Sequence, residues 1–149
     1  MSRKGVLNII GPTAVGKTDL AVRLAERIDG EIISSDSRLL YRGMDIGTAK
    51  PSLEEMKRIK HHMIDLALPD QVWSLSQYQD YEKKVILDIL NRNRSPIIVG
   101  GTGQYFRALT EGWVIPAQKP DPNMRLVLER WVKEIGPEEL YNKLKWVDP

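Results

Sequence analysis

At residues 11–18 the sequence reads Gly11-Pro12-Thr13-Ala14-Val15-Gly16-Lys17-Thr18, and this stretch decides the fold. It matches the pattern G-x-x-x-x-G-K-[ST], whose backbone N–H groups surround a phosphate chain in ATP-binding and other nucleotide-binding proteins. An apolar run at 6–10 precedes the stretch, and a helical pattern over 17–28 follows it. In a strand–loop–helix arrangement, the free N–H groups and the positive dipole end of the helix point at an anion. The sequence therefore predicts a di- or triphosphate site, with Lys17 on the outer phosphates and the Thr18 hydroxyl on Mg²⁺.

Outside this loop, short apolar runs alternate with amphipathic helices, which is typical of a parallel sheet covered by helices. Strands are predicted at 5–10, 31–34, 62–66 and 96–99, and helices at 17–28, 53–60, 75–92 and up to about 110. A proline-rich stretch at 116–122 marks a linker, after which Asp121 caps a helix that has Pro122 in its first turn. The helix break at Gly136-Pro137 predicts a second C-terminal helix. The predicted fold class is α/β, a P-loop NTPase-like parallel sheet flanked by helices, with further helices at the C-terminal end.

The composition excludes several classes of protein. The chain has 149 residues, 42% of them hydrophobic and 28% charged, and its apolar runs fall well short of a membrane span. It contains no cysteine, which excludes disulfides and thiolate metal sites and fits a cytoplasmic location. The net charge of +2 permits nucleic-acid binding without arguing for it, because a dedicated binder usually carries a concentrated basic stripe.

Asp36 follows the second predicted strand. The carboxyl ends of neighbouring parallel strands meet at the ligand crevice, so a second strand beside the first would place Asp36 next to the phosphates. The carboxylate is then a candidate base or metal partner that faces an acceptor. The alternative is a capping or turn aspartate within the run Ser34-Ser35-Asp36-Ser37.

A second glycine cluster, Gly100 to Gly103, follows the last buried strand, and Thr102 supplies its only hydroxyl. Glycines there are expected to let the backbone approach a ligand closely. The Mg²⁺-holding strand of ATPases ends in an acid instead, and Asp65 is the only comparable strand acid here. The adjacent His61 and His62 should face opposite sides of a strand, so we do not expect them to share a metal.

With these motifs in place, the chain resembles the tRNA dimethylallyltransferases, also called tRNA isopentenyltransferases. The resemblance rests on the phosphate loop and on five further segments in the same order and spacing: GEIISSDS at 30–37, YRGMDIGTAKP at 41–51, HHMID at 61–65, VGGTGQY at 99–105 and DPNMR at 121–125. The combination of the GTAKP stretch with a GPT phosphate loop is highly specific to this family.

The resemblance implies transfer of a dimethylallyl group from dimethylallyl diphosphate to the exocyclic N6 amine of the adenosine next to the anticodon of a tRNA. The phosphate loop would then hold the leaving diphosphate, whose charge Lys17 and Mg²⁺ neutralise. Asp36 matches the base that takes a proton from the weakly nucleophilic amine, while Thr102 matches a residue that helps to hold the acceptor. Arg125 matches an arginine near the tRNA, and the target base must be flipped into the pocket. The expected tRNA-contacting residues are Asp36, Ser37, Arg38, Leu39, Thr102 and Arg125.

Two departures from the family pattern stand out. The family usually has a glutamine where this chain has Leu39, and losing such a reader of a base edge costs about 1–3 kcal/mol of discrimination. Arg38 could compensate by stacking or by binding phosphate. The resemblance also covers only about the first half of a family member, with 1–116 as an incomplete P-loop core and 117–149 as the start of the helical tRNA-binding insertion. Because later arginine-bearing motifs are absent, the chain alone is expected to be weak or inactive.

Other functions remain open at this point. Adenylate isopentenyltransferases share the core and accept free AMP, ADP or ATP. A small NTP-dependent kinase would use the same phosphate loop, and a non-enzymatic module would bind phosphate without forming a product. Two chains could also associate to cover an open sheet edge.

Overall fold

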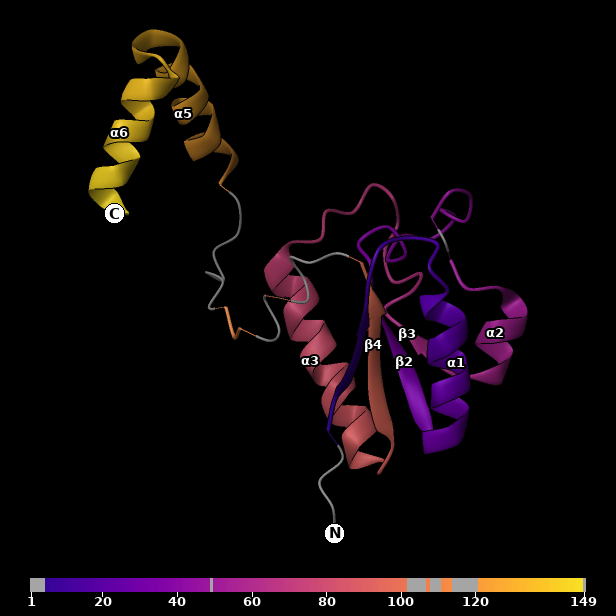
Figure 1. The fold of residues 1–149 in the computed structure, drawn as a ribbon. Coiled ribbons are helices and arrows are strands. Elements are labelled where there is room, and N and C mark those ends of the chain that lie inside the picture. The colour runs from indigo at the N-terminus through magenta and orange to yellow at the C-terminus, as the bar shows by residue number, and fades with distance from the viewer. Residues whose placement is uncertain (1–4, 49, 102–106, 108–110, 114–120, 149) are drawn as a thin grey trace. The chain divides into compact units, whose positions relative to one another are not determined.

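A computed structural model describes residues 5–48, 50–101, 107, 111–113 and 121–148. The chain divides into two compact units, Met1–Ile115 and Pro116–Pro149. In the described part of the first unit, helices cover both faces of a parallel sheet, with α3 on one face and α1 and α2 on the other (Figure 1). The second unit contains the helices α5 and α6. Across the described residues, every helix is too short or too polar to cross a membrane.

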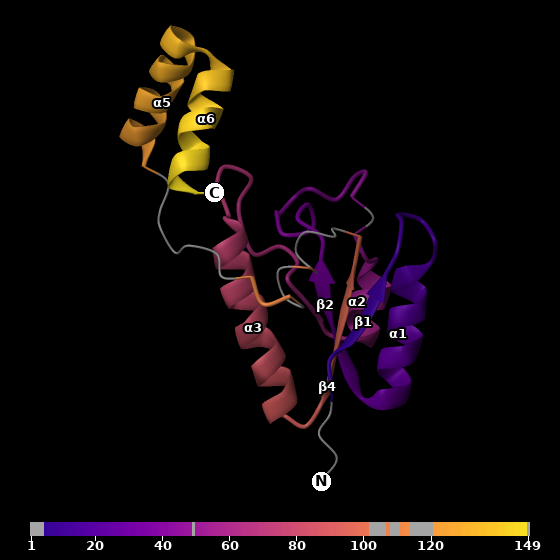
Figure 2. The ribbon, with the colours of Figure 1, turned by 60° about the vertical axis from the view of Figure 1, so that its left-hand side comes forward.

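The sheet has the order β1-β4-β2-β3, and all of its pairs are parallel. Its strands are β1 (Leu7–Ile10), β2 (Gly30–Ser35), β3 (His61–His62) and β4 (Ser95–Gly100). The prediction that the second strand lies beside the first is wrong, because β4 lies between them (Figure 2). The apolar run Pro96-Ile97-Ile98-Val99 explains this order, since a parallel strand that is apolar on both faces belongs in the middle of a covered sheet. β1 is an edge strand of the described sheet, with Leu7 42% and Ile10 47% exposed.

The helix starts predicted within the described residues are confirmed. α1 spans Lys17–Ile28, as predicted, while α2 (Leu53–Arg58) and α3 (Leu75–Asn91) both begin with a capping box. Of the two serines considered for α3, Ser74 is the cap. α5 spans Pro122–Ile135 behind the Asp121 cap, and α6 spans Pro137–Val147. The helix predicted to end near residue 110 lies largely outside the described residues.

The predicted strand at 62–66 is wrong in extent, because β3 ends at His62. Met63 and Asp65 have positive φ angles of 63° and 56°, and this left-handed backbone cannot continue an extended strand. The segment bonds instead to the loop after β2, where the Asp65 N–H donates to the Leu39 carbonyl at 3.0 Å. The acid considered as a strand carboxylate therefore lies in a turn.

The core consists of two apolar layers, one on each face of the sheet. Ile32 of β2 packs with Ile97 and Val99 of β4 against α1, whereas the next residue along β2, Ile33, faces α3. This alternation follows from the period of two in a strand, and both layers are closed because helices cover both faces. The Tyr78 hydroxyl of α3 donates to the Ser34 carbonyl at 2.6 Å, which fixes α3 to the carboxyl end of β2.

An ion-pair network fixes the other end of β2. Glu31 is fully buried, and its carboxylate accepts hydrogen bonds from Arg92 and Arg94, at 2.8 Å for the Arg94 contact. His62 also contacts this carboxylate, with Nε2 2.6 Å from Oε2. The hydrogen bond from Arg92 is the main reason that the pKa of Glu31 lies far below its ordinary value, despite burial. The network links β2, β3 and the end of α3.

Candidate functional site

The phosphate loop connects β1 to the first turn of α1. Gly16 is the N-cap residue of α1 with φ 81°, and Ala14 has φ 66°, so two left-handed residues bend the loop back toward the helix. Because Gly16 has no side chain, no cap competes with a ligand for the first N–H groups of the helix. The Lys17 ammonium donates to the Pro12 carbonyl and so lies over the loop. The predicted strand–loop–helix arrangement is confirmed.

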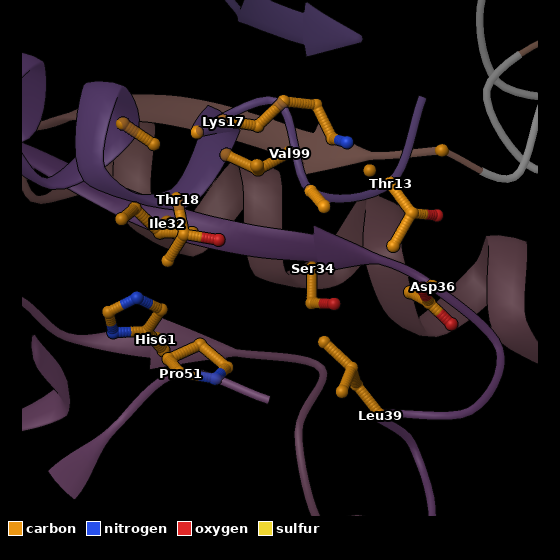
Figure 3. A pocket seen from close by; sticks show the side chains of 15 residues that line it. Thr13, Lys17, Thr18, Ile32, Ser34, Asp36, Leu39, Pro51, His61 and Val99 are labelled. Carbon is orange, nitrogen blue, oxygen red and sulfur yellow. The ribbon is translucent and has the colours of Figure 1, made fainter. Parts of the chain in front are cut away.

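A pocket of about 270 Å³ lies beside this loop, at the carboxyl ends of β2 and β4. In Figure 3, Lys17 and Thr13 lie on one side of it, Leu39 and Pro51 on the opposite side, and Ser34 between them. The lining residues come from the phosphate loop and α1, from β2 and the turn after it, from β3, from β4 and from the segment before α2. They are Thr13, Ala14, Gly16, Lys17, Thr18, Ala21, Ile32, Ser34, Asp36, Leu39, Pro51, His61, Val99, Gly100 and Gly101.

Asp36 combines the two interpretations that the sequence left open. Its Oδ1 accepts the Arg38 backbone N–H at 2.9 Å, so the residue does form a turn. It also lines the pocket together with Lys17 and Thr18. One carboxylate oxygen is therefore held by the turn, while the half-buried side chain faces the phosphate-loop pocket.

Glycines at the end of β4 allow Asp36, which follows β2, to lie close to the phosphate loop, which follows β1, although β4 lies between these two strands. A Cβ added at Gly100 would lie 2.3 Å from the carbonyl oxygen of Ser35, and one at Gly101 would lie 3.3 Å from that of Gly11. The strand end that precedes Asp36 and the start of the phosphate loop thus both pack closely on β4. The predicted close approach to a ligand stays a prediction, and the structure shows close approach to neighbouring backbone. Thr102 lies outside the described residues.

One wall of the pocket is apolar. Leu39 is buried there, and Ile32, Pro51 and Val99 also contribute to the lining. Within this wall, the buried Ser34 hydroxyl has no hydrogen-bond partner among the described residues. The pocket therefore offers an apolar surface with a polar group available to a ligand.

His61 is a pocket residue that the sequence did not single out. Its Nδ1 lies 2.8 Å from the Ile59 carbonyl, which can only accept, so Nδ1 carries the proton and Nε2 is left as an acceptor. Burial lowers the pKa of His61, which favours this neutral form. Its neighbour His62 contacts Glu31 instead, so the two rings have different surroundings, as predicted. No local motif marks His61 as a pocket residue, because it is the pairing of β3 with β2 that brings His61 to the pocket.

A second cavity of about 360 Å³ adjoins the first, with which it shares Thr13, Asp36 and Gly101. Its other lining residues are Pro12, Ser37, Arg38, Gly47 and Thr48. The side chains here are mainly hydroxyls and one guanidinium, in contrast to the apolar wall of the first pocket. The predicted acceptor-side residues Ser37 and Arg38 thus lie beside Asp36, but in this second cavity, whereas Leu39 lines the first.

The loop that carries the GTAKP stretch is anchored by Lys50. Its ammonium contacts Asp45 and Asp65, each at 2.5 Å, and the buried Thr48 hydroxyl donates to the Met44 carbonyl at 2.6 Å. Burial alone would lower the pKa of Lys50, but its hydrogen bonds to the two aspartates raise it, so the ammonium stays charged. Asp65 therefore acts as a structural partner of Lys50.

The remaining predicted site residues are Thr18 and Arg125. Thr18 lines the pocket at the start of α1. No group of three or more histidine, cysteine, aspartate or glutamate side chains in the described part of the chain could hold a metal. Arg125 lies on α5 in the second unit, where it is exposed and pairs with Glu129 at 3.2 Å.

Comparison with known proteins identifies the family. The sequence profile of the IPP transferase family matches residues 39–149. The chain is 51% identical to a tRNA dimethylallyltransferase of Roseiflexus sp. (strain RS-1) and 52% identical to one of Chloroflexus aurantiacus, over 97% of this chain in each case. These matches cover 47% and 49% of the two relatives, so the chain spans about half the length of the curated relatives it matches.

Solved structures agree. A full-length tRNA isopentenylpyrophosphate transferase from Bacillus halodurans matches 99% of this chain and 48% of its own, with TM-score 0.73 and 43% identity. A eukaryotic dimethylallyltransferase described as acting on tRNA matches 98% of this chain and 36% of its own, with TM-score 0.82 and 32% identity. The P-loop NTPase-like fold and the resemblance inferred from the motifs are confirmed, and the chain belongs to the IPP transferase family.

Proposed function

We propose that this chain supplies the donor site and the catalytic base for transfer of a dimethylallyl group to the N6 amine of the adenosine next to a tRNA anticodon. One observation carries the proposal: a single pocket joins the phosphate loop, an apolar wall and the Asp36 carboxylate. Relatives named tRNA dimethylallyltransferase support it. A tRNA acceptor also requires a compartment that contains tRNA, in keeping with the cytoplasmic location expected from the sequence.

The donor fits the first pocket. Its diphosphate would lie on the N–H groups of the phosphate loop and on Lys17, and its hydrocarbon chain would pack against Leu39 and Val99. As the allylic C–O bond breaks, negative charge develops on the diphosphate and positive charge on the allylic carbon. The Lys17 ammonium and the start of α1 stabilise the leaving group, while the apolar wall keeps water from the cation.

Asp36 would act on the acceptor. The amine of adenine is a weak nucleophile because its lone pair is delocalised into the ring. A new N–C bond forms as the C–O bond breaks, and the proton lost from N6 passes to the oxygen of Asp36 that does not accept the Arg38 N–H. Thr102 and Arg125 are proposed to contact the tRNA, on the strength of the sequence alone. The products are the N6-dimethylallyl adenosine and free diphosphate.

Mg²⁺ is the proposed metal, and Thr18 is the residue that would hold it. The donor set fits, because a hydroxyl is a hard oxygen ligand and this cation commonly binds few protein side chains together with phosphate oxygens and water. Thr18 lines the pocket beside Lys17, where the diphosphate is proposed to bind. When bound, the metal would neutralise charge on the leaving diphosphate.

The test measures binding and transfer separately. Calorimetry should show that the chain prefers dimethylallyl diphosphate to ATP, whereas a preference for ATP would favour a kinase and refute the proposal. Labelled dimethylallyl diphosphate is then incubated with either tRNA or AMP and with the chain, for which slow transfer is expected. Label on tRNA supports the proposal, while label on AMP alone indicates an adenylate isopentenyltransferase. The matched control is D36N, which should bind the donor and transfer the label at least about a hundredfold more slowly.

A further inference from the structure

The second cavity has a chemistry of its own. It has a volume of about 360 Å³ and adjoins the donor pocket through Thr13, Asp36 and Gly101. Its lining contains three hydroxyl side chains, Thr13, Ser37 and Thr48, and glycine backbone but no aromatic ring. A cavity of this kind suits a hydrophilic, charged group better than a stacked base. The proposed base Asp36 lies in the wall common to both cavities.

Arg38 is the cation of this cavity, and its guanidinium is available. In the described part of the chain, its side chain makes no hydrogen bond and no ion pair, and it is exposed. The nearby Arg42, by contrast, donates to the Asp65 carbonyl at 2.7 Å. The Arg38 backbone is fixed, because its N–H donates to Asp36 at 2.9 Å. Among the described residues, an unpaired guanidinium therefore extends from a fixed backbone position two residues from the proposed base.

Arg38 is the only cation among the residues that line this cavity, where the Thr13 and Ser37 hydroxyls could add hydrogen bonds to an anion. The Thr48 hydroxyl already donates its proton to the Met44 carbonyl, so only its lone pairs face the cavity. The Asp36 carboxylate would repel an anion at this distance. An anionic group can therefore bind here only if a cation offsets that repulsion, and the planar guanidinium matches two phosphate oxygens at once.

From these observations we infer that Arg38 binds a phosphate group of the acceptor, the one attached to the ribose of the target adenosine. The inference rests on the proposed function, in which the donor fills the first pocket and the amine meets Asp36. The adenosine would then approach from the second cavity, with its sugar–phosphate on the polar lining. The same chemistry is offered by an RNA backbone linkage and by the 5′-phosphate of a free nucleotide.

The test measures the binding affinity of charge variants of the whole chain for charged and uncharged probes. The phosphate loop is saturated with inorganic diphosphate and Mg²⁺ throughout. The probes are an anticodon stem-loop RNA, the same RNA with uncharged methylphosphonate linkages on both sides of the target adenosine, and AMP. R38A should bind the phosphate RNA at least about tenfold more weakly than the wild type and the methylphosphonate RNA equally well. R38K should bind the phosphate RNA with an affinity between those of R38A and the wild type. R27A, which removes an exposed arginine from the last turn of α1, is the matched control and should bind like the wild type.

The two sources of phosphate give different results. A loss confined to the RNA assigns the site to a backbone linkage, and a loss confined to AMP assigns it to a free nucleotide. The inference is overturned if R38A binds both RNA and AMP as tightly as the wild type does, or if R27A loses as much affinity as R38A. It is also overturned if R38A loses as much affinity for the methylphosphonate RNA as for the phosphate RNA, or if the wild type binds neither RNA nor AMP. Donor binding is measured separately: R38A should bind dimethylallyl diphosphate normally, and failure of the wild type to bind it would defeat the proposed function itself and this inference with it.

Discussion

Glu82 offers a quantitative test of the structure, because its carboxyl group is buried. It lies in α3 and is 1% exposed, and its Oε2 has no hydrogen-bond partner among the described residues. Burial raises its pKa from 4.5 to about 7, although the nearby Lys83 acts in the opposite direction. Glutamine has nearly the same shape and no charge. E82Q should therefore stabilise the protein above pH 4.5, where the glutamate of the unfolded chain releases its proton.

The sign and size of this effect follow from the pKa. Below pH 4.5 the group is protonated in both the folded and the unfolded states, so its raised pKa does not lower the free energy of unfolding. Between 4.5 and about 7 the unfolded chain releases its proton while the folded protein keeps it, so stability falls as pH rises. Above about 7 the loss is complete and amounts to about 3 kcal/mol, at about 1.4 kcal/mol for each tenfold change in proton affinity.

Urea unfolding of both proteins, from about pH 5 to about pH 8, measures this difference. The stability gain of E82Q over the wild type should be small at the acid end and approach about 3 kcal/mol at the alkaline end. D80N removes an exposed carboxylate from the same helix and should show no such trend. A gain that is the same at both ends, or a variant less stable than the wild type at pH 8, would refute the reasoning.

Three further predictions concern the site and its support. In a complete enzyme, D36N should lower turnover by about a hundredfold or more while donor affinity stays nearly constant, and equal losses of both would exclude Asp36 as the base. K17A should weaken binding of dimethylallyl diphosphate by about tenfold or more in calorimetry, and unchanged affinity would contradict the assignment of the phosphate loop. E31A should lower the free energy of unfolding at pH 7 by about 2–3 kcal/mol, less than for a fully buried pair because Arg92 and Arg94 can return to water. Since the folded pKa of Glu31 is depressed, this difference should shrink as pH falls below 4.5, and a constant difference would show that the ion pairs contribute little.

Helix starts could be predicted from the sequence because their chemistry is local. In each capping box a serine side chain accepts the N–H of the residue three positions later, and that residue's side chain returns to the serine N–H. Ser52 with Glu55 and Ser74 with Gln77 both meet this condition within four residues of chain. The phosphate loop is local in the same sense, because its eight residues contain the whole turn into α1. Such features require no knowledge of the rest of the fold.

Strand order and the far side of the pocket depend on contacts that sequence spacing does not encode. Glu31 meets Arg92 across 61 positions, and nothing in either neighbourhood indicates the other. The HHMID segment looked like a strand because its apolar residues fit one, but positive φ angles at Met63 and Asp65 turn the chain toward the loop after β2. His61 therefore joins the pocket through a two-residue strand whose length no apolar pattern specifies.

The relation of Asp36 to the phosphate loop shows how a residue without a side chain can set the distance between two parts of the proposed site. The two segments follow β2 and β1, which are not neighbours, so their separation is set by how closely both strand ends pack on β4. At Gly100 any Cβ would lie 2.3 Å from the Ser35 carbonyl oxygen, and relief of that clash must move the residue that directly precedes Asp36. A displacement of about 1 Å at a reacting group can cost about a hundredfold in rate. Gly100 thus contributes to the proposed chemistry through spacing, which explains why a glycine pair, rather than an acid, can end the central strand of this site.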